Sequence, residues 1–207
     1  NWWLTTSETA VAGKTFGNVD FTPLLATGDA DAGAVGFQAD YGTLYVTALG
    51  AQVQSGGRIN EAIGLVDVGG TVYVGPGVFS EDVAVNKFLD LIGSGSGANP
   101  VSNTIVQPAT TPFGNAMVIS ADGLSASDRL TIADMRVQGS RFDNLVVVAG
   151  SHVRLDNVAT RGGRAGVYIG SGDISDLYII DSDFSQSNQK GFEQRYGVSG
   201  DIDGLTI

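Results

Sequence analysis

Two hydrophobic periods follow one another along residues 59–95. In the first part, apolar residues recur at i, i+3, i+4 and i+7, the spacing of one helical face: Ile59, Ala62, Ile63 and Val66. Two glycines at 69 and 70 end this pattern. Beyond them, apolar and polar residues alternate in runs of only a few residues, separated by Gly, Pro or Ser. The sequence therefore predicts one short helix over 59–66, followed by short strands joined by tight corners.

A repeat runs through the second half of the chain. The segments 130–137, 153–160 and 177–184 each carry apolar residues at positions one and three and an Asp or Asn at position five. These position-five residues are Asp134, Asn157 and Asp181, at intervals of 157 − 134 = 23 and 181 − 157 = 24. A further Leu-Thr-Ile begins at Leu205, an interval of 205 − 177 = 28 after Leu177. A near-constant period of this length predicts a solenoid with one coil per repeat.

A second set of apolar segments lies between these repeats, at 144–150, 166–172 and 191–197. Each segment ends at a glycine, where we expect the backbone to turn with a positive φ. The alternative is an antiparallel sandwich, but its hairpins would require Asn-Gly or Asp-Gly turns, and only Asp122-Gly123 and Asp203-Gly204 offer them. We therefore expect parallel coils with stacked inward residues. The predicted inward residues include Val146, Val148, Val167, Ile169, Leu177 and Ile179.

The stretch 69–95, GGTVYVGPGVFSEDVAVNKFLDLIGSG, resembles the first coil of the pectin-lyase-like superfamily. With the helix before it, the resemblance implies an all-β fold, a right-handed parallel β-helix solenoid with a short N-terminal capping helix. The same opening serves polysaccharide lyases, esterases and non-enzymatic surface proteins, so the resemblance implies an architecture rather than an activity. The residues that carry esterase and galacturonan-hydrolase chemistry in such proteins have no counterpart here.

The opening of the chain is similar to the closing segment of a β-helix in large bacterial secreted and surface proteins. The similarity lies in Asn-Trp-Trp at 1–3 and in the stretch from Gly17 to Leu24. We interpret residues 1–25 as such a closing segment or a donated strand. Residues 26–51 are then an acidic Gly/Ala/Asp linker with a lead-in strand, and 52–207 a parallel β-helix that is incomplete at its C-terminus. The chain is thus expected to be a repeat module of a larger bacterial protein.

Composition narrows the classes of partner. Thirty glycines and only 16% charged residues favour β structure over helical structure. The net charge of −11 would repel a nucleic acid, so we expect no nucleic-acid partner. No apolar run approaches the roughly 20 residues that span a bilayer, so we expect no membrane insertion. The absence of cysteine excludes disulfides and thiolate metal sites.

The sequence assigns no catalytic residue and no cofactor other than calcium as a candidate ion. His152 is the only histidine, and we expect it to be a solvent-facing turn residue. Asp181 and Asp183 lie two apart, as on one side of a strand. Arg154, Arg161 and Arg164 are candidates to share a face with Asp134 or Asp156. The candidate calcium ligands are Asp29, Asp31, Asp181 and Asp183.

These observations favour a structural or adhesive protein that is secreted or held at the cell surface. We expect rods or filaments to form by end-to-end stacking of β-helices, either with a second copy or with neighbouring repeats of the same polypeptide. The expected assembly interface consists of Trp2, Trp3, Leu205 and Ile207. The alternative is a carbohydrate-binding or polysaccharide-lyase-type β-helix that acts on an acidic polysaccharide.

Overall fold

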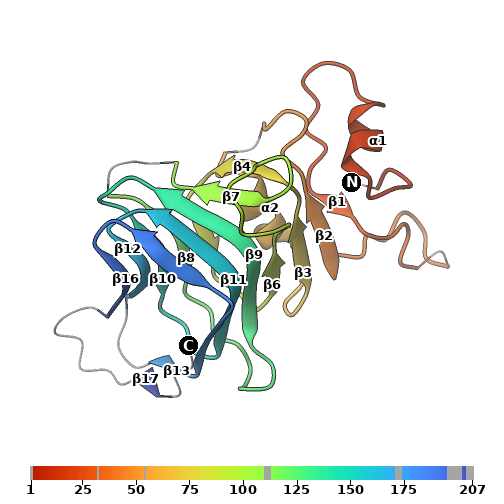
Figure 1. The fold of residues 1–207 in the computed structure, drawn as a ribbon. Coiled ribbons are helices and arrows are strands. Elements are labelled where there is room, and N and C mark those ends of the chain that lie inside the picture. The colour runs from red at the N-terminus through yellow and green to blue at the C-terminus, as the bar shows by residue number, and fades with distance from the viewer. Residues whose placement is uncertain are drawn as a thin grey trace.

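The chain forms a right-handed parallel β-helix, which confirms the fold predicted from the sequence. A computed structural model describes residues 2–31, 33–53, 55–109, 113–170, 174–194 and 202–203. They wind through about six turns of a β-solenoid (Figure 1). The coils are joined by parallel strand pairs, and the antiparallel pair between β1 and β2 lies at the N-terminal end.

Strands of two to ten residues and two short helices are the regular elements of the described part of the chain. The helices are α1 (Glu8–Ala12) and α2 (Arg58–Leu65). The strands up to the middle of the chain are β1 (Leu24–Leu25), β2 (Thr43–Val46), β3 (Thr71–Val74), β4 (Gly77–Ser80), β5 (Val83–Val85), β6 (Asp90–Ile92), β7 (Thr104–Gln107) and β8 (Asn115–Ile119). The later strands are β9 (Leu130–Gly139), β10 (Asn144–Val148), β11 (Val153–Gly162), β12 (Ala165–Ile169), β13 (Ile174–Ser175), β14 (Leu177–Ile180), β15 (Asp183–Ser187), β16 (Lys190–Gln194) and β17 (Ile202–Asp203).

Three columns of strands form the faces of the solenoid. The first column contains β2, β3, β6, the first halves of β9 and β11, and β14. The second contains β4, β7, the second halves of β9 and β11, and β15. The third contains β5, β8, β10, β12 and β16.

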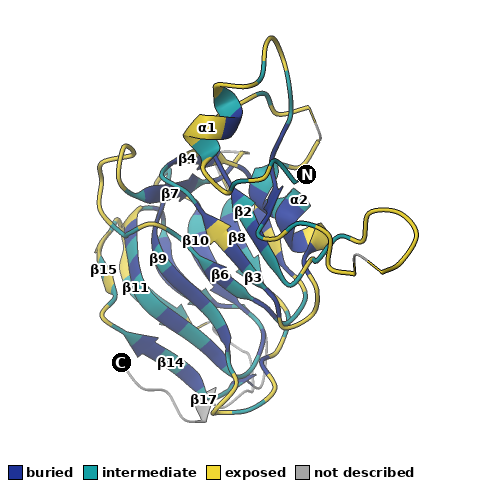
Figure 2. Ribbon diagram, turned by 90° about the vertical axis from the view of Figure 1, so that its right-hand side faces the viewer, coloured by how far each residue is buried: buried dark blue, intermediate teal, exposed yellow. Residues whose placement is uncertain are grey.

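Inward apolar residues stack into ladders along these columns, because each strand alternates its side chains between core and solvent. The register of the first column aligns Leu44, Val72, Leu91, Ile132, Leu155 and Ile179. All six are almost fully buried, and Figure 2 shows the exposed residues mainly on loops and on α1. The six residues predicted to face inward, from Val146 to Ile179, are also buried.

The position-five residues of the repeat form one corner in successive coils. Asp134, Asn157 and Asp181 have φ values of 54°, 50° and 51°, in the left-handed region that Asn and Asp tolerate better than most residues. Asn157 Nδ2 donates to Asp134 Oδ1 at 2.7 Å, so neighbouring corners are linked. The repeat found in the sequence thus corresponds to a recurring backbone turn.

The glycine at position 150 was expected to turn with a positive φ, and this expectation is wrong. Gly150 has no positive φ, and its lack of a side chain serves a close approach instead. A Cβ atom at this position would clash with the carbonyl oxygen of Ala121 in the preceding coil. Positive φ occurs nearby at His152 (53°) and Asp176 (56°). The other two segment-ending glycines, Gly172 and Gly197, lie outside the described residues.

The N-terminal end of the solenoid is covered by its own chain. β1 pairs with the edge of β2, and α2 packs its buried residues against the first coils, as a capping helix does. Trp2 packs against the main core, and Trp3 packs with Val11, Phe21 and Leu24 in a smaller cluster. Both tryptophans remain partly exposed. No helix among the described residues is long and apolar enough to cross a membrane.

Helix α2 is capped by a residue far away in sequence. Its N-cap position, Gly57, offers no side-chain cap. Glu81, in the turn between β4 and β5, instead accepts hydrogen bonds from the backbone N–H groups of Ile59 (3.1 Å) and Asn60 (3.0 Å). Glu81 is only 3% exposed, and burial raises the pKa of its carboxyl group. A buried carboxyl group therefore fixes the capping helix to the first complete coil.

Candidate functional site

A row of polar side chains crosses the outer face of the second column. Register pairs Ser80 with Gln107, Gln138 with Arg161, and Arg161 with Gln186. Gln107 Nε2 donates to Ser80 Oγ at 2.8 Å, and Gln138 Nε2 donates to Gln107 Oε1 at 3.3 Å. Because adjacent coils lie about 4.8 Å apart, this row across five strands is about 19 Å long.

Four of these residues line a concavity of about 510 Å³, which we call the polar groove. Its lining residues are Gln107, Pro108, Gln138, Gly139, Ser140, Arg161, Gly162, Gln186 and Asn188. Amide groups and a guanidinium dominate its polar surface, and none of these nine residues is acidic. These lining residues therefore offer many hydrogen-bond donors and acceptors but no carboxylate for acid–base catalysis.

Arg136 lies beside the polar groove and is only 6% exposed. It precedes Gln138 by two positions on β9, so both face outward. Arg136 Nη2 donates to Gln186 Oε1 at 3.2 Å, while its Nε has no partner among the described residues. Burial, followed by the positive charge of Arg161, lowers the pKa of Arg136. A desolvated positive charge thus adjoins a second arginine.

An exposed aromatic pair, Phe113 and Phe142, lies close in sequence to residues that line the polar groove. The rings of Phe113 and Phe142 stack with their centroids 5.1 Å apart, and the Arg141 guanidinium lies 4.8 Å from the centroid of the Phe142 ring. Phe113 is 76% exposed and has a φ of 75°, which is unfavourable for a bulky residue. The backbone therefore holds a large apolar ring in solvent at a conformational cost.

A buried carboxylate holds the two loops that carry this pair. Asp143 is fully buried and accepts hydrogen bonds from the backbone N–H groups of Gly114 (3.0 Å) and Ser140 (2.7 Å). Gly114 follows Phe113, and Asp143 itself follows Phe142. Because Ser140 lines the polar groove, Asp143 links the aromatic pair to the lining of the groove. Sequence reasoning singled out neither Asp143 nor the two phenylalanines.

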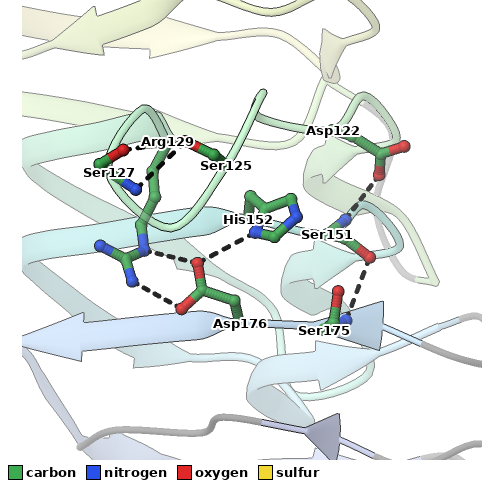
Figure 3. A network of polar contacts seen from close by, with 8 residues as sticks. All are labelled: Asp122, Ser125, Ser127, Arg129, Ser151, His152, Ser175 and Asp176. Carbon is green, nitrogen blue, oxygen red and sulfur yellow. Dashed lines mark hydrogen bonds and ion pairs between the residues drawn. The ribbon is translucent and has the colours of Figure 1, made fainter.

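A second polar cluster contains the histidine. His152 Nδ1 lies 3.1 Å from Asp176 Oδ2, and the same carboxylate receives two bonds from Arg129, of 2.9 Å from Nε and 2.6 Å from Nη2 (Figure 3). His152 is in a turn, as predicted, but it is only partly exposed and has an acidic partner. The interval between the two residues equals one coil of the repeat, so the repeat period could have identified this pair.

This cluster does not form a hydrolytic triad. Figure 3 shows Ser151 close to His152, but the Ser151 hydroxyl accepts a hydrogen bond from the Ser175 backbone N–H at 3.0 Å. Among the described residues, no serine hydroxyl is hydrogen-bonded to the imidazole. Arg129 also neutralises the carboxylate that would orient the base. The cluster therefore ties successive coils together rather than activating a nucleophile.

Replacing Asp176 by Asn is expected to change the acid stability of the chain. The hydrogen bond from Arg129 is the main cause that lowers the pKa of Asp176. Its stabilising contribution is therefore present above the ordinary aspartate range and is lost as the pH falls through the lowered pKa. At pH 7 we expect Asp176→Asn to lower Tm by about 1–3 °C, since a partly exposed pair contributes about 1 kcal/mol at most.

Well below the ordinary aspartate range, the Tm values of this variant and the parent should converge, as measured by circular dichroism. Asn also tolerates the positive φ at position 176, so the backbone is matched. A Tm difference that does not vary with pH would contradict the role given to the Asp176 charge.

The structure places the other predicted site residues apart. Asp29 accepts from the backbone N–H groups of Asp31 and Gln38, and Asp31 accepts from that of Gly33, so both shape their own loop. Asp181 forms a corner with positive φ while Asp183 begins β15, so the two do not share one strand as expected. Within the described part of the chain, no three His, Cys, Asp or Glu residues gather as metal ligands. Leu205 and Ile207 lie outside the described residues.

The three arginines singled out in the sequence have separate environments. Arg154 pairs with Asp156 at 2.5 Å, and Arg164 pairs with Glu193. Arg161 lies in the polar groove, without an ion pair among the described residues. The expected cluster of arginines with Asp134 or Asp156 thus reduces to the Arg154–Asp156 pair.

Comparisons with protein-family models, with curated proteins and with solved structures found no match.

Proposed function

We propose that the chain is a structural or adhesive module of a bacterial extracellular protein, of the pectin-lyase-like type, which forms rods by end-to-end stacking. A parallel β-helix suits this role because every coil is hydrogen-bonded to the next and the core is a continuous stack. The observation that carries the proposal is the strand pairing at the two ends of the described solenoid.

The N-terminal end is covered, whereas the strands described at the other end are paired only in part, with β17 (Ile202–Asp203) pairing with β13. β14 and β15 pair with β11, and β16 pairs with β12, but no described strand pairs with their far edges. Phe184 and Phe192 of this coil pack against the core and are only partly buried. Strand edges that the described residues leave open invite a further strand. A following coil, from the same polypeptide or from a second copy, would satisfy them.

The N-terminal segment lies at the opposite end of the solenoid from these strands (Figure 1). End-to-end stacking would therefore bring the last coil of one module against the Trp2–Trp3 segment of the next. Both tryptophans already pack within their own chain but keep part of their surface exposed. Such a head-to-tail contact does not close on itself, so it extends into a rod.

Replacing Trp2 and Trp3 by Ser is expected to abolish or shorten the rods. Electron microscopy and sedimentation velocity measure this directly, and circular dichroism shows whether the β-helix remains folded. The matched control is Phe16→Ser, because Phe16 is 92% exposed in the same segment. Rods of unchanged length in the double variant would remove the tryptophans from the junction. A compact monomer at all concentrations of the parent protein would overturn the assembly proposal.

Glycan binding is the second candidate function, and the polar groove favours it. An elongated row of amides can exchange hydrogen bonds with sugar hydroxyls, and exposed aromatic rings such as Phe113 and Phe142 can stack on the apolar faces of sugar rings. The row is about 19 Å long, which suits an extended ligand better than a small molecule. The groove would make the rod adhesive.

This glycan-binding function is expected to proceed without cleavage. Incubation with polygalacturonate and calcium should yield no unsaturated product that absorbs in the ultraviolet, because none of the described residues that line the polar groove is a carboxylate and Arg164 is paired with Glu193. Product release that depends on Arg161 or Arg164 would instead favour a lyase. Polygalacturonate incubated without protein gives the baseline.

A further inference from the structure

We infer that the polar groove binds an anionic glycan, and that Arg136 and Arg161 together hold its acid group. This inference rests on the glycan-binding candidate above and specifies the ligand class and the residues that recognise it. It begins from the distribution of charge, since the chain as a whole carries a net charge of −11.

Acidic side chains neutralise three arginines of the solenoid but neither Arg136 nor Arg161. Arg129 pairs with Asp176, Arg154 with Asp156, and Arg164 with Glu193. Among the described residues, neither Arg136 nor Arg161 has a carboxylate within ion-pair distance. Asp183 acts on Arg136 only from further away. In an acidic protein, two adjacent arginines without such partners form a local positive site that favours a bound anion.

The burial of Arg136 strengthens the preference of this site for an anion. A cation that is removed from water without a counter-ion is costly, and a bound anion would offset this cost. Gln186 accepts a hydrogen bond from one end of the guanidinium and so helps to orient it, while Nε remains without a partner among the described residues. A guanidinium presents parallel N–H donors that match the oxygens of a carboxylate or a sulfate.

The surroundings of the arginines indicate a glycan rather than a free anion or a nucleic acid. Gln107 and Gln138 extend the polar surface along the groove, away from the two charges. Their neutral amides can exchange hydrogen bonds with neutral groups of a ligand. A nucleic acid carries one charge per nucleotide and would meet the net negative charge of the chain. A glycan with an acid group matches both parts of the groove, because its hydroxyls can bond to the amides and its acid group to the arginines.

Isothermal titration calorimetry with defined probes tests the inference on the full chain. The probes are a galacturonate hexamer, its neutral methyl ester, a sulfated galactan hexamer and a thymidylate oligomer of six nucleotides. We expect at least one acidic hexamer to bind about tenfold or more tightly than the methyl ester, and the comparison of the two acidic hexamers distinguishes carboxylate from sulfate. Equal affinity for the acidic and neutral hexamers would leave glycan binding intact and overturn the anion site.

Absence of binding by every hexamer would overturn glycan binding itself, and with it the inference. Tighter binding of the thymidylate oligomer than of either acidic hexamer would overturn the ligand class.

Two variants locate the acid group. Arg161→Gln and Arg136→Met should each reduce affinity for the acidic hexamer about tenfold and leave affinity for the methyl ester nearly unchanged. Lys14→Gln is the control, because it removes the same charge from an exposed position at the other end of the chain. An equal loss in Lys14→Gln, or full affinity in both arginine variants, would overturn the assignment.

Thermal melting adds a readout that a structural arginine would not give. Since Arg136 is buried without a counter-ion among the described residues, Arg136→Met should melt at the same or a higher temperature than the parent. A lower Tm in Arg136→Met together with unchanged acidic-hexamer affinity would assign Arg136 to stability and overturn its binding role.

Discussion

Replacing Ile169 by Asp is expected to lower the free energy of unfolding by about 4 kcal/mol or more. Ile169 is fully buried on β12, where it lies in register between Val148 of the preceding coil and Gln194 of the following one. The substitution removes an apolar side chain from a continuous ladder, a loss of about 1.5–3 kcal/mol. It also places a carboxylate in an apolar core without a cationic partner, which adds the larger part of the cost.

Urea denaturation followed by circular dichroism measures this effect. The matched control is Tyr168→Asp, because Tyr168 is the next residue on the same strand and points outward, with the Arg164 guanidinium 5.1 Å from its ring centroid. The control should lose about 1 kcal/mol or less, since the new charge remains hydrated. Equal stability losses in the two variants would contradict the inward and outward assignment of β12.

The rows of the solenoid could be predicted because the repeat period is regular in the second half of the chain. Ile132, Leu155 and Ile179 follow one another at intervals of 23 and 24 and stack in the core. The same period predicts polar rows, since Gln138, Arg161 and Gln186 occur at intervals of 23 and 25. Most of the polar groove therefore lies within the repeat, although hydrophobic periodicity alone singles out only the apolar positions.

The part of the groove formed by Gln107 and Pro108 could not be predicted, because the period is interrupted before the repeat becomes regular. In the core ladder Ile132 follows directly on Leu91, a much longer step along the chain than the later ones, so the chain makes longer excursions there. Gln107 and Gln138 are likewise more than one regular period apart, and no fixed period aligns them. Phe113 lies in one of these excursions, and its position depends on Asp143 in the next coil. Such contacts depend on the path of the loops, which hydrophobic periodicity does not specify.

Replacing Glu81 by Ala is expected to lower the free energy of unfolding by about 2 kcal/mol. The variant leaves the backbone N–H groups of Ile59 and Asn60 without their acceptor, and Ile59 is fully buried. An unsatisfied buried donor costs about 1–3 kcal/mol, and no side chain at Gly57 can replace the cap. Glu81→Gln should lose less stability than Glu81→Ala, because its neutral amide oxygen can still accept from one of the two N–H groups.

Urea denaturation measures the global loss, and amide hydrogen exchange at Ile59 and Asn60 measures the local one. Asp67→Ala is the control, since it removes a negative charge from an exposed residue just beyond α2 and should leave both readings nearly unchanged. If Glu81→Ala exchanged and unfolded like Asp67→Ala, Glu81 would not be the cap of α2.

The pH dependence of this loss provides an independent check on the same carboxylate. Burial outweighs the hydrogen bonds from α2 and raises the pKa of Glu81, so its folded-state pKa lies above the unfolded one. The stabilisation by Glu81 is then complete below the ordinary glutamate range and decreases as the pH rises through the raised pKa. The stability difference between the parent and Glu81→Ala should therefore be larger at pH 4 than at pH 7. A difference that grows with pH would mean that the two N–H groups of α2 stabilise the charge more than burial opposes it.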